Sequence, residues 1–493
     1  MGNFFQRFGE LFRHPARRVT ARYELKPHRS NGDARDGNST VYDAGPKLRQ
    51  YARHLDQNHD LVKGALDRLT QFIVGPNGIS VEPQPRTFGG EVHTEFAAQL
   101  LEAWRDWAQK PEVTWTHDWA ACQRLLCRSW LRDGEALISL IFGNRPDLDH
   151  GTRVPFSVEL IEADFLPFNN SDTNGLRILQ SVELNGWNRP IAYWLYKEHP
   201  GGLLRTDYKL KRVSADSLLH LKLTDRIGQI RGVCKFASAL QRMNGIYKYE
   251  TAEMVAAEIA ASLTGALKTE NASIGPSNEL EGPRTFDIQP GMILDNLRPG
   301  ESLDIFSSNR PSATVEPFRN GQLRAASAGF GLSYSAMARD YNGTYSAQRQ
   351  ELVEQFDAYR ILSNQFISQV SRPVWQRFVT SAIAAGVVRQ PRDLDPLTLD
   401  DASYQPPVIP WIDPLRESNA NNAMLENYLT SPQTLIRQRG GNPDEVLNNW
   451  QQWKAKLAAR NLTPPASNQP ANPPSRPVDA GMPPYLPPYL MDA

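Results

Sequence analysis

Residues 329–354 read GFGLSYSAMARDYNGTYSAQRQELVE, a polar stretch that separates two segments of helical apolar periodicity. The segment before it, about 316–331, is short, whereas the one after it runs from about 347 to 385. The longer segment is apolar at alternating steps of three and four residues, at Leu352, Phe356, Tyr359, Leu362, Phe366, Val370, Val374 and Phe378. Pro373 lies inside it and should kink the helix. We therefore predict a polar loop between a short helix and a long, bent one.

Toward the N-terminus of that stretch, residues 235–268 carry another long helical pattern that no proline interrupts. A helix of this length would reach about 50 Å at 1.5 Å per residue, which is longer than a compact domain usually needs. Residues 270–312 then change to strand-like segments punctuated by glycine and proline. This pattern predicts a small strand module between two helices.

The first half of the chain changes from helical to strand-like patterns. Three helical patterns and then a β-rich stretch follow one another, at 47–75, 95–109, 119–134 and 136–224. Thr116 or Asp118 is a candidate cap for the third helix, and Asn185-Gly186 is a turn signal among the strands. Residues 1–40 are basic and polar, so we expect a flexible arm there and ordered structure from about Lys47.

The C-terminal part is helical and then changes abruptly. Residues 411–461 read as helices, whereas the last 33 residues contain ten prolines and no helical period. We therefore expect a proline-rich, disordered tail over 462–493. Taken together, the segments predict an α+β chain of several structural units.

The charge balance, the number of cysteines and the lengths of the apolar runs limit the classes of protein to which this chain can belong. The 493 residues hold 54 Lys+Arg and 54 Asp+Glu, so a polycationic surface for nucleic acid is not expected. The three cysteines, Cys122, Cys127 and Cys234, are too few for a disulfide framework and suggest buried thiols in a reducing compartment. No apolar run approaches the roughly 18 residues that a membrane span needs. We expect a cytosolic chain.

The sequence offers no positive sign of an enzyme. It contains no phosphate-binding GxxxxGK[ST] loop, no GxGxxG after a strand, and no HExxH, GxSxG or EF-hand spacing. The nine histidines are scattered, which favours surface or structural roles over metal binding. We therefore expect no catalytic residues, no cofactor and no metal.

Several sequence phrases follow one another in a specific order between about residues 47 and 457: ARHLDQNHDLVKGALDRLTQFIVGPNGI, WRDWA, RDGEALI, ELIEADFL, NGWNRPIAYWLY, RVSADSLLHLKL, DRIGQIRGVCKFASAL, LRPGESLDIF and GFGLSYSAMARDYNGTYSAQRQELVE. These phrases and the order of the segments resemble the lambda-type portal proteins of tailed bacteriophages. The TYSAQR phrase at 344–349 departs from the Asn-Tyr-Ser-Ser-x-Arg pattern that is more frequent in the family.

The resemblance implies a twelve-fold ring at one capsid vertex of the virion, assembled in the host cytoplasm. Double-stranded DNA would enter through this channel, driven by the terminase motor, and later leave through it. The implied partners are the large terminase subunit, a head-completion or connector protein, and capsid and scaffold proteins. The implied parts are an arm (1–40), a wing (41–234), a stem helix (235–268), a clip (269–313), a second stem helix (314–332), a tunnel loop (333–349), a kinked helix with further wing (350–410), a crown (411–461) and a tail (462–493).

In such a ring, the tunnel loop would face the bore and contact DNA without sequence specificity. Its candidate residues are Arg339, Asp340, Tyr341, Asn342, Thr344, Tyr345 and Arg349. The tyrosine, asparagine and threonine side chains could donate hydrogen bonds to phosphates, while adjacent Arg339 and Asp340 would largely cancel. We expect Arg349 to hold the loop to a neighbouring subunit. The alternative is an ordinary surface loop whose tyrosines pack on the next helix.

Two further sets of residues follow from the same resemblance. Glu250, Glu253 and Glu258, with Lys248, would line the channel along the stem and repel phosphate, or they would only solvate an outer face. The clip would dock the motor and the connector through its charged residues, Arg284, Asp287, Arg298, Glu301 and Asp304.

Two other functions remain open at this point. One is a capsid or baseplate structural protein without a channel, which an image of the particle would separate from a ring with a central hole. The other is a DNA-processing enzyme whose acidic residues are too dispersed to recognise.

Overall fold

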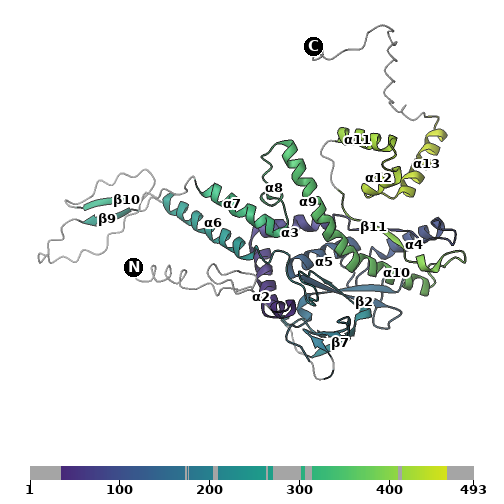
Figure 1. Cartoon of the computed structure of the whole chain (residues 1–493), viewed down its shortest axis with the longest axis horizontal. Coiled ribbons are helices and arrows are strands. Elements are labelled where there is room, and N and C mark those ends of the chain that lie inside the picture. The colour runs from purple at the N-terminus through teal and green to yellow at the C-terminus, as the bar shows by residue number, and fades with distance from the viewer. Residues whose placement is uncertain are drawn as a thin grey trace, which may run out of the picture. The chain divides into compact units, whose positions relative to one another are not determined.

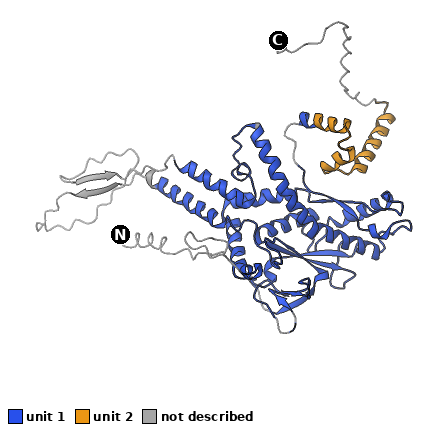
Figure 2. Cartoon of the chain, viewed as in Figure 1, with its two compact units in different colours: residues 1–417 blue, residues 418–493 orange. Residues whose placement is uncertain are grey.

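The computed structural model describes residues 35–172, 175, 177–203, 209–261, 265–269, 301–305, 314–408 and 414–462. The chain divides into two compact units, residues 1–417 and 418–493 (Figure 2). Helices and strands both contribute to the first unit, and the described part of the second is helical (Figure 1). No helix in the described residues is long and apolar enough to cross a membrane.

Ordered structure begins earlier than the sequence predicted. Helix α2 (Gly37–Asn58) starts beside Asp36, whose side chain accepts a hydrogen bond from the Ser39 N–H at 3.0 Å. Our expectation of an arm to residue 40 and order from Lys47 was therefore wrong at this boundary. The polar residues GNST at the start of α2 show no helical apolar periodicity, so the sequence did not indicate a helix there. Asp36 caps this helix start, and Val41 is buried in the core.

The helical pattern over 47–75 is two helices and not one. Helix α2 ends at His59, which has an extended backbone, and α3 (Asp60–Ile73) follows directly. Helices α4 (Thr94–Trp107) and α5 (Trp119–Asp133) confirm the next two predicted helices. Asp118 is the cap of α5, since its carboxylate accepts from the Ala121 N–H at 2.7 Å.

The region predicted to be β-rich holds two antiparallel sheets. The first has the order β3-β2-β8, from Phe156–Ile161, Glu135–Phe142 and Leu218–Lys222. The second has the order β4-β5-β6-β7, from Ile178–Leu179, Val182–Leu184, Pro190–Tyr196 and Leu210–Ser214. The predicted turn at Asn185 is present, because its side chain accepts from the N–H groups of Trp187 and Arg189, both at 2.9 Å.

The long helix expected over 235–268 is shorter. Helix α6 spans Leu240–Ala261, and residues Gly265–Thr269 form strand β9, which pairs antiparallel with β10 (Glu301–Ile305). Gly265 is a poor helix former, and the pairing with β10 satisfies the backbone of the segment instead. The return helix α7 (Val315–Phe330) lies beside α6, and the pair extends away from the sheets (Figure 1).

The second half of the first unit contains the bent helix. Helix α9 (Tyr345–Phe366) passes through a π-helical turn, Ile367–Ser371, into α10 (Arg372–Ala384). Pro373 lacks an N–H donor, and the irregular turn falls immediately before it, so the predicted irregularity at this proline is present as a π-helical turn. Strand β11 (Ala402–Gln405) then pairs with β1 (Ser80–Pro83).

The core of the first unit is rich in aromatic residues. Trp104, Trp107, Trp375 and Phe378 come from α4 and α10 and pack against one another, with ring centroids 4.7 to 5.7 Å apart. All three cysteines are buried, and burial raises the pKa of the Cys122 and Cys234 thiols to about 12. These thiols are therefore protonated and inert at neutral pH, as the sequence suggested.

The second unit contains α12 (Pro432–Gln438), α13 (Pro443–Ala459) and most of α11 (Pro414–Glu426). These helices agree with the helical pattern predicted over 411–461. The expected disordered tail, from residue 463 on, lies outside the described residues, as does the expected arm up to residue 34.

Candidate nucleic-acid interface

The polar stretch folds into a short helix and a six-residue loop, residues 339–344. Helix α8 (Tyr334–Ala338) begins at Ser333, whose hydroxyl accepts from the N–H three residues on at 3.2 Å. It ends at Arg339, which has a left-handed backbone with φ of 54°. Thr344 then caps α9 by accepting from the Ala347 N–H at 3.4 Å. The loop expected over 333–349 is therefore shorter than predicted, because α8, capped by Ser333, lies inside it and α9, capped by Thr344, begins before its expected end.

Side chains hold the base of this loop. The Ser335 hydroxyl donates to Glu351 on α9, and the Tyr334 hydroxyl donates to Asp340 at 3.4 Å. Partial burial and the Asp340 carboxylate raise the pKa of Tyr334, so it remains a donor at neutral pH. Arg324 on α7 lies 5.1 Å above the Tyr334 ring. The loop is thus anchored to the helices before and after it.

The outer side of the loop is exposed and nearly neutral. Arg339, Asn342, Gly343 and Thr344 are exposed, and Tyr341 has 55% of its surface in solvent. Asp340 is half-buried, and its carboxylate also accepts from the backbone N–H of residue 342 at 3.2 Å. The loop therefore presents several neutral hydrogen-bonding groups beside Arg339, whose charge the neighbouring Asp340 carboxylate offsets, so that its net charge is zero.

The two remaining loop candidates belong to α9. Tyr345 is the first residue of α9, and Arg349 lies one turn further along. Arg349 is exposed, and its guanidinium is 3.7 Å from the Glu417 carboxylate. The contact with a neighbouring subunit that the sequence suggested for Arg349 stays a prediction.

The candidate channel-lining residues on α6 differ in environment. Lys248 and Glu258 are exposed, whereas Glu253 is only 7% exposed. Glu250 forms an ion pair with Arg319 on α7. The sequence did not suggest this pairing, because Arg319 lies 69 residues away in the chain. Within one chain, Glu258 is thus the most accessible of the three predicted carboxylates, and their role along a channel stays a prediction.

The α6–α7 pair also exposes apolar side chains. Tyr249 and Phe318 join the two helices edge to face, with centroids 5.0 Å apart. Phe318 nevertheless remains 50% exposed, and Met254 on α6 remains 65% exposed. A helix pair that leaves such side chains in water has surface available for other chains.

The candidate clip residues are only partly within the described structure. Glu301 and Asp304 are on β10, where they pair in register with Thr269 and Ala266 of β9. The other three candidates, Arg284, Asp287 and Arg298, lie outside the described residues.

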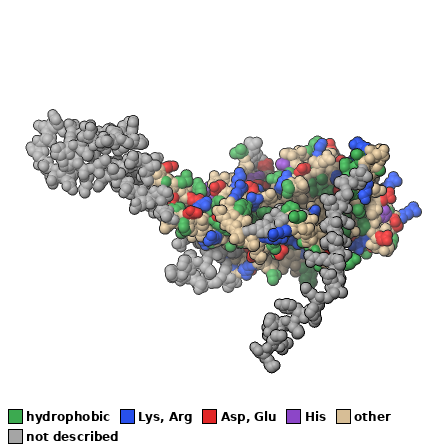
Figure 3. Space-filling model, turned by 90° about the horizontal axis from the view of Figure 1, so that it is seen from above, with side chains coloured by type: hydrophobic (Ala, Val, Ile, Leu, Met, Phe, Trp, Pro, Cys, Tyr) green, Lys and Arg blue, Asp and Glu red, His purple; other side chains and the backbone are tan. Residues whose placement is uncertain are grey.

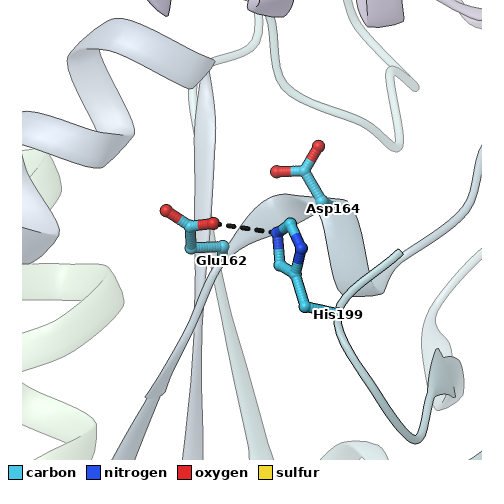
Figure 4. Close-up of side chains that lie close together, drawn as sticks. All are labelled: Glu162, Asp164 and His199. Carbon is cyan, nitrogen blue, oxygen red and sulfur yellow. Dashed lines mark hydrogen bonds and ion pairs between the residues drawn. The ribbon is translucent and has the colours of Figure 1, made fainter. Parts of the chain in front are cut away.

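One cluster of possible metal ligands occurs in the described part of the chain. Glu162, Asp164 and His199 lie close together, and His199 is hydrogen-bonded to Glu162 at 3.1 Å (Figure 4). Asp164 is already paired with Arg53 and faces Arg49 at 3.9 Å. Because arginines compensate the charge, the cluster is an ion-pair network and gives no evidence for a metal site.

Comparison with known sequences identifies the protein family to which this loop and these helices belong. The sequence model described as "Phage portal protein, lambda family" matches residues 27–362. This range is most of the chain and includes the 339–344 loop and helices α6 and α7. The chain belongs to the lambda family of phage portal proteins.

Individual portal proteins agree with this assignment. The chain is 26% identical over 436 residues to the "Probable portal protein" of Halomonas phage phiHAP-1, covering 85% of this chain and 82% of the relative. It is 24% identical over 313 residues to "Portal protein B" of Escherichia phage lambda, covering 57% and 56% of the two chains. The "Portal protein" of Escherichia phage N15 is also 24% identical, over 341 residues, covering 61% and 62%.

Among solved structures, the chain is similar to one from the "Neck of native GTA particle computed with C12 symmetry". The identity is 12%, the TM-score is 0.48, and the match covers 81% of this portal and 95% of that chain. The function rests on the family instead. As a member of it, this portal is a structural component of the phage particle and forms the channel through which DNA enters and leaves the capsid.

Proposed function

We propose that twelve copies of this portal form a ring at one capsid vertex, with the 339–344 loop directed into the bore. In this arrangement, α6 and α7 are the stem, the β9–β10 segment lies in the clip, and α11–α13 form the crown. The first helices and the two sheets belong to the wing. The ring is assembled in the host cytoplasm and becomes part of the virion.

The observation that carries the proposal is the exposed, nearly neutral surface of the 339–344 loop on an anchored base. Duplex DNA carries one phosphate charge per ~1.7 Å of its axis, and a strongly cationic ring would bind it through counterion release. The uncharged side chains of Tyr341, Asn342 and Thr344 can donate hydrogen bonds to phosphates without the strong attraction that a ring of cations would exert. A nearly neutral loop surface of this kind suits DNA that must slide. Figure 3 shows one face of the molecule, on which acidic and basic side chains are interspersed.

In a ring of twelve copies, each charged residue of the stem is repeated twelve times around the channel, and the resulting charges are also compatible with DNA that slides. Glu258 is exposed on α6 and would form a ring of twelve carboxylates that repels phosphate. Glu250 would contribute less, because Arg319 compensates its charge. Repulsion along the stem, with neutral contacts at the loop, keeps DNA centred without holding it.

The direct test replaces the loop tyrosines. Tyr341→Ala with Tyr345→Ala should leave ring assembly unchanged but lower the amount of DNA packaged or retained per particle. The matched control is Tyr42→Ala on α2, where the side chain is 46% exposed but outside the loop. Normal packaging and retention in the double variant would contradict a loop that faces DNA.

The partners at the ring's outer end are part of the proposal. The clip would bind the large terminase subunit during packaging and a head-completion or connector protein afterwards, while capsid and scaffold proteins would contact the wing. Transient docking suits polar interfaces such as one containing Glu301 and Asp304. Reversing the charge of Arg298 should reduce packaging while rings still form. If reversal of all five clip charges left packaging normal, docking would lie elsewhere.

A further inference from the structure

Helix α13 carries an exposed aromatic face. Val446, Trp450, Trp453 and Leu457 follow one another at steps of four, three and four residues, which places them on one side of the helix. Trp450 and Trp453 are each 55% exposed, and Val446 and Leu457 are half-buried. Two adjacent tryptophans on a stable helix form an apolar surface of a kind that usually has a partner.

The described helices of the second unit leave the two tryptophans of this face exposed. Among the described residues of α11, α12 and α13, only Pro443 is buried. Leu447, one turn before Trp450, is 61% exposed. The face therefore remains in water within the described part of the unit, which is unfavourable for side chains of this size.

The sequence that follows α13 contains a suitable occupant. Residues 483–490 read PPYLPPYL, a tandem repeat of Pro-Pro-Tyr-Leu. Proline-rich segments adopt the polyproline II conformation at little entropic cost, and aromatic surfaces recognise them through their proline and neighbouring apolar side chains. We propose that the repeat at 483–490 docks on the Trp450–Trp453 face of α13 and covers it.

The chain is long enough for this contact. Twenty residues, 463–482, connect the end of the described structure to the repeat. Six of these residues are prolines, and a Pro-rich linker of this length can span up to roughly 60 Å at about 3.1 Å per residue. Trp453 lies six residues before the end of α13, or about 9 Å along the helix axis. The span therefore exceeds the distance to the face, so the repeat can reach it within the same chain and the contact is intramolecular.

The charges of the repeat and of the residues around the α13 face are compatible with the proposed docking. The repeat contains no charged residue, as expected for a segment that lies on tryptophan side chains. Lys454 and Lys456 flank the face and are exposed. Asp492, two residues after the repeat, is the only charged side chain in residues 480–493, and its charge is opposite to that of the two lysines.

The test uses the full chain with one fluorescent label at the repeat. A bimane attached to Leu490→Cys reports on contact with tryptophan, which quenches it at short range. The label is selective because Cys122, Cys127 and Cys234 are buried. We expect strong quenching that is lost in Trp450→Phe with Trp453→Phe. An excess of synthetic peptide with the sequence MPPYLPPYLMDA should also release it.

Two controls make the result specific. Trp187→Phe removes a tryptophan that is 92% exposed in the first unit and should leave the quenching unchanged. Replacing the four repeat prolines with alanine should abolish quenching, although both tyrosines remain. The proposal is overturned if the label is equally bright with and without Trp450 and Trp453, or if Trp187 is responsible for the quenching.

Discussion

At the scale of single residues, the most connected group is the buried carboxylate of Glu135. It pairs with Arg231 and Arg49, accepts from the Gly232 N–H at 3.1 Å, and contacts His220 Nε2 at 2.9 Å. These partners hold the pKa of Glu135 well below its usual range, against the opposing effect of burial. Glu135 lies in RDGEALI and Arg231 in DRIGQIRGVCKFASAL, two of the segments that carry the family resemblance in the sequence. Their pairing across 96 residues was not, because spacing along the chain carries no information about it.

This cluster predicts a loss of stability in acid. Burial, with Lys222 and Arg231 nearby, lowers the pKa of His220 to about 4. An unfolded histidine has a pKa of about 6.5, so the unfolded chain takes up this proton first as the pH falls. The stability that neutral His220 contributes is present above pH 6.5 and is lost between about pH 6.5 and 4, by up to about 3 kcal/mol. Glu135 adds a loss in the same direction below about pH 4.5.

The measurement is the apparent free energy of unfolding in urea at several values between pH 7 and 4.5. His220→Gln should flatten this dependence, whereas His54→Gln, at an exposed position on α2, should not. An unchanged pH dependence in His220→Gln would show that another group titrates in this window.

At the scale of elements, local signals predicted most helices and strands but not their ends. Helices α4, α5 and α7 and the two sheets follow from periodicity and turn residues. The early end of α6 depends on pairing between β9 and β10, whose residues lie more than 30 positions apart. The loop was predicted as polar, but the caps at Ser333 and Thr344 shorten it to 339–344.

The junction between α5 and β2 gives the second prediction. Gly134 has φ of 86°, and a Cβ there would lie 2.3 Å from the carbonyl carbon of Val233. Gly134→Ala should therefore destabilise the chain by more than about 3 kcal/mol, since it adds a backbone clash to a left-handed conformation. Gly143, with φ of 80° and no atom within 4 Å of such a Cβ, is the matched control. Its alanine variant should lose only about 1 to 2 kcal/mol, as judged by thermal unfolding. Equal losses would mean that the Val233 contact is unimportant.

At the scale of the whole molecule, the order of the elements identified the family, while the chemistry of the candidate site stayed open. The loop and stem residues could be named because the family's parts follow in sequence. Which of them face the bore depends on neighbouring copies, and no pattern within one chain encodes that geometry. The pairing of Glu250 with Arg319 shows how a charge that looks available in the sequence can be compensated in the fold.

The termini give the third prediction. The N-terminal arm, and the tail apart from its 483–490 repeat, carry too little apolar surface to offset their ordering entropy, and the repeat is proposed to dock within its own chain, so neither terminus should be needed for the ring. Deleting 462–493 should leave the oligomer intact, as measured by light scattering after size-exclusion chromatography. An N-terminal deletion should end before Asp36, which caps α2. Collapse of the tail deletion to monomers would show that the tail joins subunits.

The central claim is a ring whose bore is lined by the 339–344 loop. Electron cryo-microscopy of the purified full-length oligomer tests it most directly, with the ring number and the radius of each loop read from the map. The map should show twelve copies around an open central hole, with residues 339–344 closer to the axis than any other part of the first unit. An assembly without a hole, or a ring that carries this loop on its outer surface, would contradict it.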